Sequence, residues 1–374
     1  MKKKVLHVIT GLNQGGAERQ LANLVTRMPD ESVVFSLLKP GVMADELKEA
    51  GVHLYHGGVT RSFSPAWLAA LRIAIKTERP DIVVGWMYHG NVAASLSALL
   101  GHKGPILWNV RHSVHDIARE KTTTRLAIKA GKLLAKTPAR VIYNSEVAAT
   151  QHELLGYPRS KRVVLPNGFD LARFRVDDET RCHWRSKLGL SSDALLLGVV
   201  GRSHPMKNHI GWLEAFYEVV REKPSAHCVM IGSGVAENNG SVASAVRELG
   251  LSSNVTLLRP TATPETLYPA FDLLVMPSLW GEGFPNVVGE AMACGVPALV
   301  TNVGDAALVV GNTGFVVDGD SPGALAKRTV LALDLGQSGL KELGGRAHER
   351  MHECFSLNSV VQRYRDIFES TIKC

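Results

Sequence analysis

Two successive series of short apolar segments, each followed by a segment with helical periodicity, constrain the fold of this chain more than any other feature. Strands that alternate with helices in this way form parallel sheets covered by helices on both faces. The first series predicts strands at residues 5–9, 33–38, 81–85, 106–110, 141–143 and 163–165, with helices at 17–27, 66–76, 91–100 and 124–136. The second predicts strands at 195–200, 228–231, 255–258, 273–276 and 298–300, with helices at 210–221, 241–249, 286–293 and 323–335.

A length of 374 residues suits two domains of about 150–200 residues each. Residues 166–176 show no clear periodicity and are predicted to join the two domains. We expect an N-terminal Rossmann-like domain over 1–168 and a C-terminal one over 169–356, with the amphipathic segment 357–374 packing back on the first. Doubly wound sheets bind ligands at the carboxyl ends of their strands, so the two sheets are expected to face a shared cleft.

The five cysteines are odd in number and widely spaced, which favours free thiols in a reducing compartment over disulfides or a zinc site. The basic N-terminus precedes only a short apolar stretch and predicts a first strand rather than a secretory signal. No apolar run approaches the roughly 20 residues that a membrane-spanning helix needs. The sequence thus predicts a cytoplasmic protein.

A formal net charge of +7 indicates an anionic partner, which by charge alone is a nucleic acid, an anionic lipid or a phosphorylated small molecule. Aromatic residues make up only 6% of the chain and are not interleaved with basic ones as in RNA-binding segments. We therefore expect no nucleic acid among the partners.

The turn after the first predicted strand contains the glycine pair Gly15 and Gly16. Glycines at a strand-to-helix turn let the backbone approach a ligand closely, and the helix start behind them offers amides to a phosphate. The GxGxxG spacing of dinucleotide sites is absent, so an NAD site is not indicated. The alternative is a glycine turn that serves only tight packing.

The corresponding turn of the second series, GRSHPMKNH, carries Arg202 and Lys207. Two cations five residues apart at the end of a strand suit one diphosphate, which the arginine binds in a forked manner and the lysine as a point charge. The alternative is a pair of solvated surface cations.

The segment PSLWGEGFPNVVGEAMACGVP, residues 277–297, places Glu282 in a glycine-flanked loop and Glu290 in the following helix. Between them the helix start presents amides of residues 283–286. Carboxylates accept hydrogen bonds from hydroxyl groups strongly, so sugar and ribose are natural ligands. A glycosidase acid pair is the rival use of two carboxylates, and a helix start suited to phosphate between them disfavours it.

The string EGFPNVVGEAMACGVP, with its E-x7-E spacing, resembles the signature of the retaining nucleotide-sugar glycosyltransferases of family 4. The segments GLNQGGAERQLANLV, LPNGFD and GRSHPMKNH also resemble family segments in their usual order, so the resemblance spans most of the chain. It implies the GT-B fold, an α/β architecture of two Rossmann-like, doubly wound parallel-sheet domains that face a central cleft. It also implies an enzyme of bacterial surface-polysaccharide synthesis.

The resemblance assigns roles to the four charged residues of the second half. Arg202 and Lys207 match the family's pair on the donor diphosphate. Glu290 matches the glutamate expected on the nucleotide ribose. Glu282 matches the one expected on the transferred sugar.

Further positions are carried over by the same resemblance. The backbone amides of Gly283, Phe284 and Asn286 are expected to contact the sugar or the distal phosphate, and Gly16 lets the first loop approach the diphosphate. His112, after the strand at 106–110, resembles the family's acceptor-side histidine; the alternative is a structural histidine. The loop after residues 255–258 departs from the family, which tends to have glycine where this chain has Arg-Pro, so the nucleotide base stays open.

The implied reaction retains the anomeric configuration by departure and attack on the same face of the sugar. Fixed cations and helix-start amides stabilise the leaving diphosphate, so the resemblance implies neither a metal nor a cofactor. The partners are a nucleotide-sugar donor, such as a UDP- or GDP-sugar, and a glycan or lipid-linked acceptor.

A basic amphipathic segment in the first half bears on the acceptor. Arg125, Lys129, Lys132 and Lys136 recur at helical spacing, with an adjoining apolar face predicted at Leu126, Ala130, Leu133 and Leu134. Such a helix is typical of peripheral contact with anionic lipid, here the inner face of the plasma membrane; the alternative is a solvated basic face over the core. Membrane contact would favour a polyprenyl-diphosphate-linked glycan as acceptor.

Two other functions fit parts of this pattern. A sugar-nucleotide epimerase or hydrolase of the same architecture would turn over the donor without an acceptor. A non-catalytic nucleotide-sugar-binding partner would bind the donor only. The sugar, the linkage and the oligomeric state are not determined by the sequence.

Overall fold

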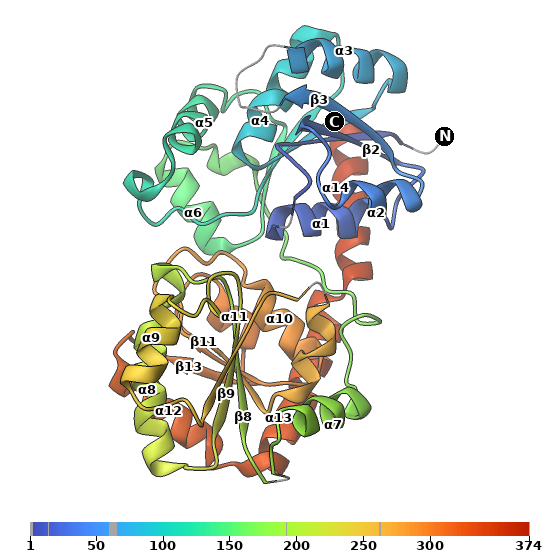
Figure 1. Cartoon of the computed structure of the whole chain (residues 1–374). Helices are drawn as coiled ribbons and strands as arrows, with labels where there is room; N and C mark the ends of the chain where they lie inside the picture. The colour runs from blue at the N-terminus through green and yellow to red at the C-terminus, as the bar shows by residue number, and fades with distance from the viewer. Residues whose placement is uncertain (1–2, 14, 60–65, 192, 262, 374) are drawn as a thin grey trace. The chain divides into compact units, whose positions relative to one another are not determined.

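The computed structural model describes residues 3–13, 15–59, 66–191, 193–261 and 263–373. It divides into two compact units (Figure 1). The N-terminal unit consists of Met1–Gly168 and Leu357–Cys374, and the C-terminal unit consists of Phe169–Ser356.

A seven-stranded parallel sheet forms the centre of the N-terminal unit, in the order β3-β2-β1-β4-β5-β6-β7. Its strands are β1 Val5–Ile9, β2 Ser32–Leu38, β3 His53–Val59, β4 Ile82–Trp86, β5 Ile106–Val110, β6 Arg140–Tyr143 and β7 Arg162–Val164. The strand order reverses between β1 and β4, which is the topology of a doubly wound sheet.

Helices cover both faces of this sheet. They are α1 Gly16–Val25, α2 Ala44–Glu49, α3 Ala66–Glu78, α4 Met87–Leu96, α5 Thr122–Leu133, α6 Glu146–Leu154 and α14 Leu357–Lys373. Val5 and Ile9 of β1 pack in one core cluster with α1, α2 and α14, whereas Leu6 and Val8 pack in the other with α3 to α6. Alternate side chains of a strand point to opposite faces, so a strand buried on both sides is apolar almost throughout.

The C-terminal unit has a six-stranded parallel sheet in the order β10-β9-β8-β11-β12-β13. Its strands are β8 Leu196–Val200, β9 His227–Ile231, β10 Val255–Leu258, β11 Leu273–Met276, β12 Ala298–Thr301 and β13 Phe315–Val317. Its helices are α7 Asp178–Lys187, α8 His209–Glu222, α9 Ser241–Glu248, α10 Asn286–Ala293, α11 Ala306–Val310, α12 Pro322–Leu333 and α13 Gly336–Phe355. One core cluster holds α8, α9 and α12, and the other holds α10 and α11. Helix α13 contributes Leu340 to the first and Ala347, Met351 and Phe355 to the second.

The predicted class of two doubly wound parallel-sheet domains is confirmed, but strands β3 and β13 and helices α2, α6, α7, α11 and α13 were not predicted. Strand β3 contains two glycines and lies at the sheet edge, and β13 has only three residues, so neither shows a clear apolar pattern. Helix α13 contains four glycines, which weaken its helical signal, although it is 20 residues long.

The basic helix α5 differs from its prediction in two respects. It ends at Leu133, so Lys136 lies beyond it. Its buried residues are Ala127, Ile128 and Gly131, whereas two leucines assigned to the apolar face, Leu126 and Leu133, are 57% and 86% exposed. Ala127 and Ile128 belong to the same core cluster as Ala93 and Ala94 of α4, and the two helices are in contact. The outer surface of α5 therefore combines leucines with basic side chains.

Two further properties concern the cysteines and the apolar helices. Among the described residues, Cys182, Cys228, Cys294 and Cys354 are free thiols. Within the same part of the chain, none of the helices is both long and apolar enough for a membrane crossing.

Candidate functional site

Strand order brings two distant loops together in the C-terminal unit. β8 and β11 are neighbours in the sheet although two strands separate them in the chain, so the turn after β8 and the loop after β11 lie at the same edge. The Leu279 amide donates to the Met206 carbonyl at 2.8 Å and links these two segments directly. Two of the predicted site residues, Lys207 and Glu282, lie in them.

Lys207 and Glu282 form an ion pair, with Nζ 2.6 Å from Oε1. The side chains are only 17% and 11% exposed, so water screens the pair weakly. The Ser278 hydroxyl donates to the same carboxylate oxygen at 2.8 Å. Ser278 was not among the predicted site residues. It lies in the segment 277–297, but a serine by itself does not indicate a binding or catalytic role.

The loop that carries Glu282 is supported from the adjacent strand, β12. The Thr301 hydroxyl donates to the Ser278 carbonyl at 2.6 Å, and the Asp305 amide donates to the Gly283 carbonyl at 2.8 Å. Gly304 has φ of +61°, and a Cβ there would overlap the Glu282 carbonyl oxygen. The two loops thus fit together only with glycine at this position.

The turn after β8 is held by a buried histidine. His209 Nε2 lies 3.1 Å from the Gly201 carbonyl oxygen. Burial lowers the pKa of His209, so the ring is neutral at physiological pH and its Nε2–H donates to that carbonyl. The Arg202 side chain, by contrast, is exposed, and the hydrogen bonds found among the described residues do not draw it into the Lys207–Glu282 cluster. Only one of the two predicted cations is therefore fixed.

Helix α10 begins directly after Pro285 and has the bounds predicted from the sequence, 286–293. The Gly283, Phe284 and Asn286 positions lie at this helix start, where backbone amides point away from the helix. The Phe284 side chain is buried and packs edge-on against Phe355, with ring centroids 5.3 Å apart. The phenylalanine thus anchors the helix start in the core of its unit.

Glu290 lies on the same helix and is partly buried. The Tyr268 hydroxyl donates to its Oε2 at 2.8 Å. Burial, together with the neighbouring Glu290 carboxylate, raises the pKa of Tyr268 well above its usual value, so this hydroxyl stays protonated and remains a donor. Tyr268 was not predicted as a site residue, because an apolar segment with a tyrosine is typical of a core.

In the N-terminal unit, Gly15 precedes α1 and Gly16 is its first residue. Both glycines are exposed, so the start of this helix is accessible. The Arg19 guanidinium binds both Glu46 carboxylate oxygens, at 2.7 and 2.8 Å, and ties α1 to α2.

His112 follows β5 and forms a hydrogen bond from Nε2 to Glu120 Oε1 at 2.8 Å. This hydrogen bond lowers the Glu120 pKa, so the carboxylate is ionised at physiological pH. The pair resembles the histidine–carboxylate arrangements that fix an imidazole tautomer. Glu120 was not predicted, since its spacing from His112 follows no motif.

The His112 ring also lies against a buried aromatic network. Tyr88 lies edge-on to it, with ring centroids 6.2 Å apart, and the Tyr88 hydroxyl lies 2.9 Å from His152 Nε2. His152 Nδ1 donates to the Ala148 carbonyl, and burial lowers the His152 pKa to about 4. The neutral His152 therefore accepts a hydrogen bond from Tyr88, and His112 contacts both Tyr88 and Glu120.

The structure thus brings Lys207 and Glu282 into contact and places Glu290 on the adjoining helix, whereas Gly15, Gly16 and His112 belong to the N-terminal unit. No cluster of three or more His, Cys, Asp or Glu side chains suited to a metal ion occurs within the described ranges. The groups that the C-terminal site offers are an ammonium, two carboxylates and helix-start amides, which suit a ligand carrying both phosphate and hydroxyl groups.

Two family descriptions match the chain. Residues 14–173 match Glycosyltransferase Family 4, and residues 194–334 match Glycosyl transferases group 1. The D-inositol 3-phosphate glycosyltransferase of Streptomyces avermitilis is 31% identical over 372 residues, covering 90% of this chain and 76% of that protein. EpsF of Bacillus subtilis is 27% identical over 311 residues, covering 80% and 79%.

Solved structures share the architecture. The crystal structure of Anabaena Alr3699/HepE in complex with UDP has a TM-score of 0.85 at 20% identity, over 98% of this chain and 100% of that one. WaaG, a glycosyltransferase involved in lipopolysaccharide biosynthesis, has a TM-score of 0.72 at 17% identity, over 97% and 99%. The chain has two parallel-sheet units of this kind, and its matched segments contain the Lys207 and Glu290 motifs. It therefore belongs to glycosyltransferase family 4 and has the GT-B fold.

Proposed function

We propose that this protein is a retaining, metal-independent glycosyltransferase that transfers a sugar from a nucleoside diphosphate to a glycan or lipid-linked acceptor. The observation that carries the proposal is the Lys207–Glu282 ion pair beside the start of α10, with Glu290 further along the same helix. Support also comes from similar proteins: HepE has been crystallised with UDP and with UDP-glucose, and WaaG is involved in lipopolysaccharide biosynthesis. We infer a role in bacterial surface-polysaccharide synthesis.

In the proposed reaction, Lys207 and Arg202 bind the donor diphosphate, and the amides of Gly283, Phe284 and Asn286 contact the distal phosphate or the sugar. The bond between the anomeric carbon and the diphosphate oxygen breaks as negative charge grows on the leaving group. Preorganised cations and amides stabilise that charge without having to reorganise. The acceptor hydroxyl forms the new bond on the same face, and its proton passes to a phosphate oxygen.

The two glutamates divide the donor between them in this proposal. Glu282 accepts hydrogen bonds from the transferred sugar, and Glu290 accepts them from the ribose. In the structure, Glu282 holds Lys207, so donor binding must exchange this internal partner for a phosphate and a sugar hydroxyl. The glycine turn at Gly15 and Gly16 approaches the diphosphate, and His112, held by Glu120, acts on the acceptor side.

The acceptor is proposed to be attached to a membrane lipid, with the enzyme bound at the cytoplasmic face. Lys129, Lys132 and Lys136 are exposed, and the exposed leucines of α5 lie among them. Basic side chains attract anionic headgroups, and leucines insert at the boundary with the acyl chains. No cofactor is required in this proposal, because the nucleotide sugar is a substrate.

The experiment that tests the proposal follows donor consumption and product configuration by NMR, with UDP-, GDP- and ADP-sugars and a polyprenyl-diphosphate-linked glycan. We expect transfer to depend on the acceptor, to persist in EDTA and to retain the configuration at the anomeric carbon. Epimerisation or hydrolysis that proceeds equally without an acceptor would contradict the proposal. So would complete loss of transfer in EDTA that Mg²⁺ or Mn²⁺ restores.

A further inference from the structure

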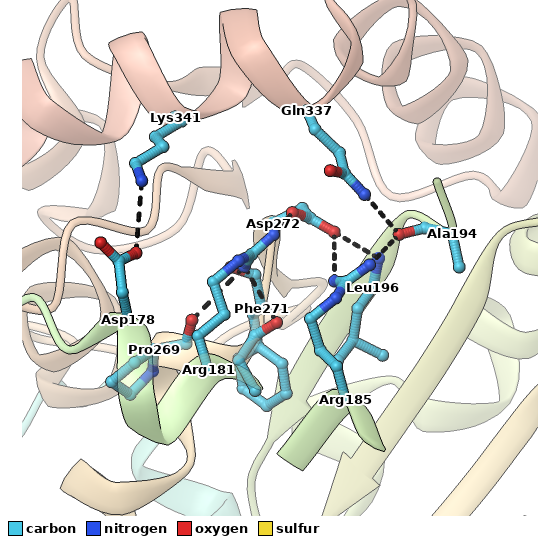
Figure 2. Close-up of polar contacts among 11 residues, drawn as sticks. Asp178, Arg181, Arg185, Ala194, Leu196, Pro269, Phe271, Asp272, Gln337 and Lys341 are labelled. Carbon is cyan, nitrogen blue, oxygen red and sulfur yellow. Dashed lines mark hydrogen bonds and ion pairs between the residues drawn. The ribbon is translucent and has the colours of Figure 1, made fainter. Parts of the chain in front are cut away.

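Figure 2 shows a cluster of charged residues around Asp272. It lies at the amino end of β11, the end opposite the Glu282 loop. The Asp272 side chain, only 3% exposed, directly precedes this strand and accepts hydrogen bonds from Arg181 and Arg185 of α7. The Leu196 amide donates to the same carboxylate at 2.7 Å. Charge-assisted bonds of this kind, shielded from water, hold α7 firmly against β8 and β11.

Arg181 also binds the backbone before Asp272. Its Nη1 donates to the carbonyl oxygens of Pro269, Ala270 and Phe271 at 3.4, 3.1 and 3.1 Å (Figure 2). These residues belong to, or directly follow, the 3₁₀ turn Tyr268–Ala270. A single guanidinium thus fixes the turn that carries Tyr268, the residue bonded to Glu290.

The Tyr268 side chain is confined from several directions. It is 1% exposed, and its ring lies 6.2 Å from the Phe174 ring and edge-on to Phe271 at 6.3 Å, measured between centroids. Its hydroxyl donates to Glu290 Oε2 at 2.8 Å. A rigid ring on a fixed turn therefore presents one hydrogen-bond donor to the flexible carboxylate of α10.

We infer that Tyr268 is a positioning residue for donor binding: its hydroxyl holds the Glu290 carboxylate in the orientation that accepts the ribose hydroxyls, and Arg181 holds the turn that carries it. The inference rests on the proposed ribose role of Glu290. A glutamate has several rotatable bonds, and fixing them before the ligand arrives removes an entropic cost of binding. Without the tyrosine hydroxyl, the carboxylate must be ordered when the nucleotide binds, and the binding free energy is reduced by that cost.

Tyr268→Phe tests the inference because it removes the hydroxyl and keeps the ring. Calorimetry with UDP, GDP and ADP, and with their 2′,3′-dideoxy counterparts, measures how much affinity depends on the ribose hydroxyls. We expect the variant to bind the preferred ribonucleotide about 3- to 10-fold more weakly, since one hydrogen bond of this kind is worth about that much. Affinity for the dideoxy compound should not change, and KM for the donor should rise with kcat at saturation retained.

Tyr217→Phe is the matched control, because it removes an exposed hydroxyl from α8 of the same unit. Arg181→Lys is a second variant that keeps a positive charge near Asp272 but loses the forked contacts, and it should show the same ribose-selective loss. Thermal unfolding of each variant shows whether the unit is folded. If ribonucleotide and dideoxynucleotide weaken equally in Tyr268→Phe, the tyrosine has a merely structural role and the inference is wrong.

Glu290→Gln separates this inference from the function proposed above. If that variant weakens ribonucleotide binding and Tyr268→Phe does not, the ribose role stands and only the positioning role is wrong. If Glu290→Gln leaves ribonucleotide binding unchanged, the ribose assignment is wrong and the inference with it. In the double variant, the loss should match that of Glu290→Gln alone, because the tyrosine acts through the carboxylate.

Discussion

The Lys207 ammonium lies 2.6 Å from Glu282 Oε1, so the cation proposed for the diphosphate and the carboxylate proposed for the sugar neutralise each other in this structure. The pair joins two residues 75 positions apart in the chain. It neutralises a carboxylate that would repel the diphosphate at the proposed site, and it holds both side chains near the place where they are proposed to act. In the proposed reaction, donor binding replaces the Lys207–Glu282 contact by one contact of Lys207 with a phosphate and one of Glu282 with a sugar hydroxyl. The variants below test these two roles separately.

Glu282→Gln should damage turnover without weakening the binding of free nucleoside diphosphate. The substitution removes the internal partner of Lys207, so calorimetry should show equal or several-fold tighter nucleotide binding, while kcat falls by about 10²-fold or more. Glu290→Gln should weaken the binding of free nucleotide and of intact donor alike. Equal losses of nucleotide affinity in both variants would contradict this division of roles.

Lys207→Ala and Arg202→Ala should each lower kcat/KM by about 10²-fold or more, the usual effect of losing one preorganised charge stabiliser. Their effects on stability should differ. Arg202 is exposed, so its loss should leave the melting temperature unchanged, whereas loss of Lys207 leaves the shielded Glu282 without its cation and should cost about 1–3 kcal/mol. Kinetics and thermal unfolding of the two proteins provide the measurement; near-normal turnover in both would remove them from the site.

Glu120→Gln should impair transfer while donor binding stays normal. The glutamine can still accept a hydrogen bond from His112 but carries no charge, so only the electrostatic support of the imidazole is lost. We expect kcat with acceptor to fall and its pH profile to shift, whereas nucleotide affinity is unchanged. His115→Gln, in the same loop and exposed, is the control. A Glu120→Gln enzyme with normal kcat and pH profile would show that the hydrogen bond is only structural.

The carboxyl of Glu78 should make the stability of the N-terminal unit depend on pH. Burial raises its pKa, but hydrogen bonds from Lys4, His53 and Tyr55 outweigh this and lower the pKa to about 2. Because the folded pKa lies below the unfolded one, the stabilisation is complete above about pH 5 and is lost as the pH falls towards 2.

The measurement for Glu78 is thermal unfolding of wild type and Glu78→Gln across this pH range. The variant should be less stable by about 1–3 kcal/mol at pH 7, and the difference should shrink as the pH is lowered. Glu49→Gln, an exposed substitution in the same unit, should show no such trend. A stability difference that is constant from pH 7 to pH 3 would contradict the assignment.

Helix α5 and the turn after it should dock the protein on anionic membranes. Each basic residue near such a surface is worth about 1 kcal/mol, so replacing Arg125, Lys129, Lys132 and Lys136 by Gln should abolish sedimentation with anionic liposomes. Binding of wild type should fade with salt, because the Debye length shrinks from about 10 Å at 0.1 M to about 3 Å at 1 M. Transfer to a lipid-linked acceptor should slow, with donor binding unchanged.

Two comparisons complete the membrane experiment. Replacing four exposed basic residues of the C-terminal unit, Lys187, Arg221, Lys327 and Arg346, removes the same charge and should leave sedimentation intact. Leu126→Ser with Leu133→Ser should weaken binding at high salt most, since the leucines contribute by burial rather than by charge. If the quadruple α5 variant still sediments, the basic surface is only a solvated face.

The sequence by itself determined the architecture and the candidate residues. Buried parallel strands are apolar throughout and their helices are amphipathic, so local periodicity placed most elements, including 286–293 to the residue. The prediction of elements failed where that periodicity is absent, as in the glycine-rich α13 and the edge strand β3.

Only the tertiary structure decided which residues meet. The Lys207–Glu282 pair exists because β8 lies beside β11, a strand order that no local pattern encodes. The hydrogen bonds of Tyr268 to Glu290 and of Glu120 to His112 likewise join residues whose spacing follows no rule. The exposure of Leu133 follows from which residues of α5 enter the core of the N-terminal unit, and these are Ala127, Ile128 and Gly131. Hydrophobic periodicity indicates which face of a helix or strand is buried. Which residues of two different elements meet depends on how all the elements of the unit pack together.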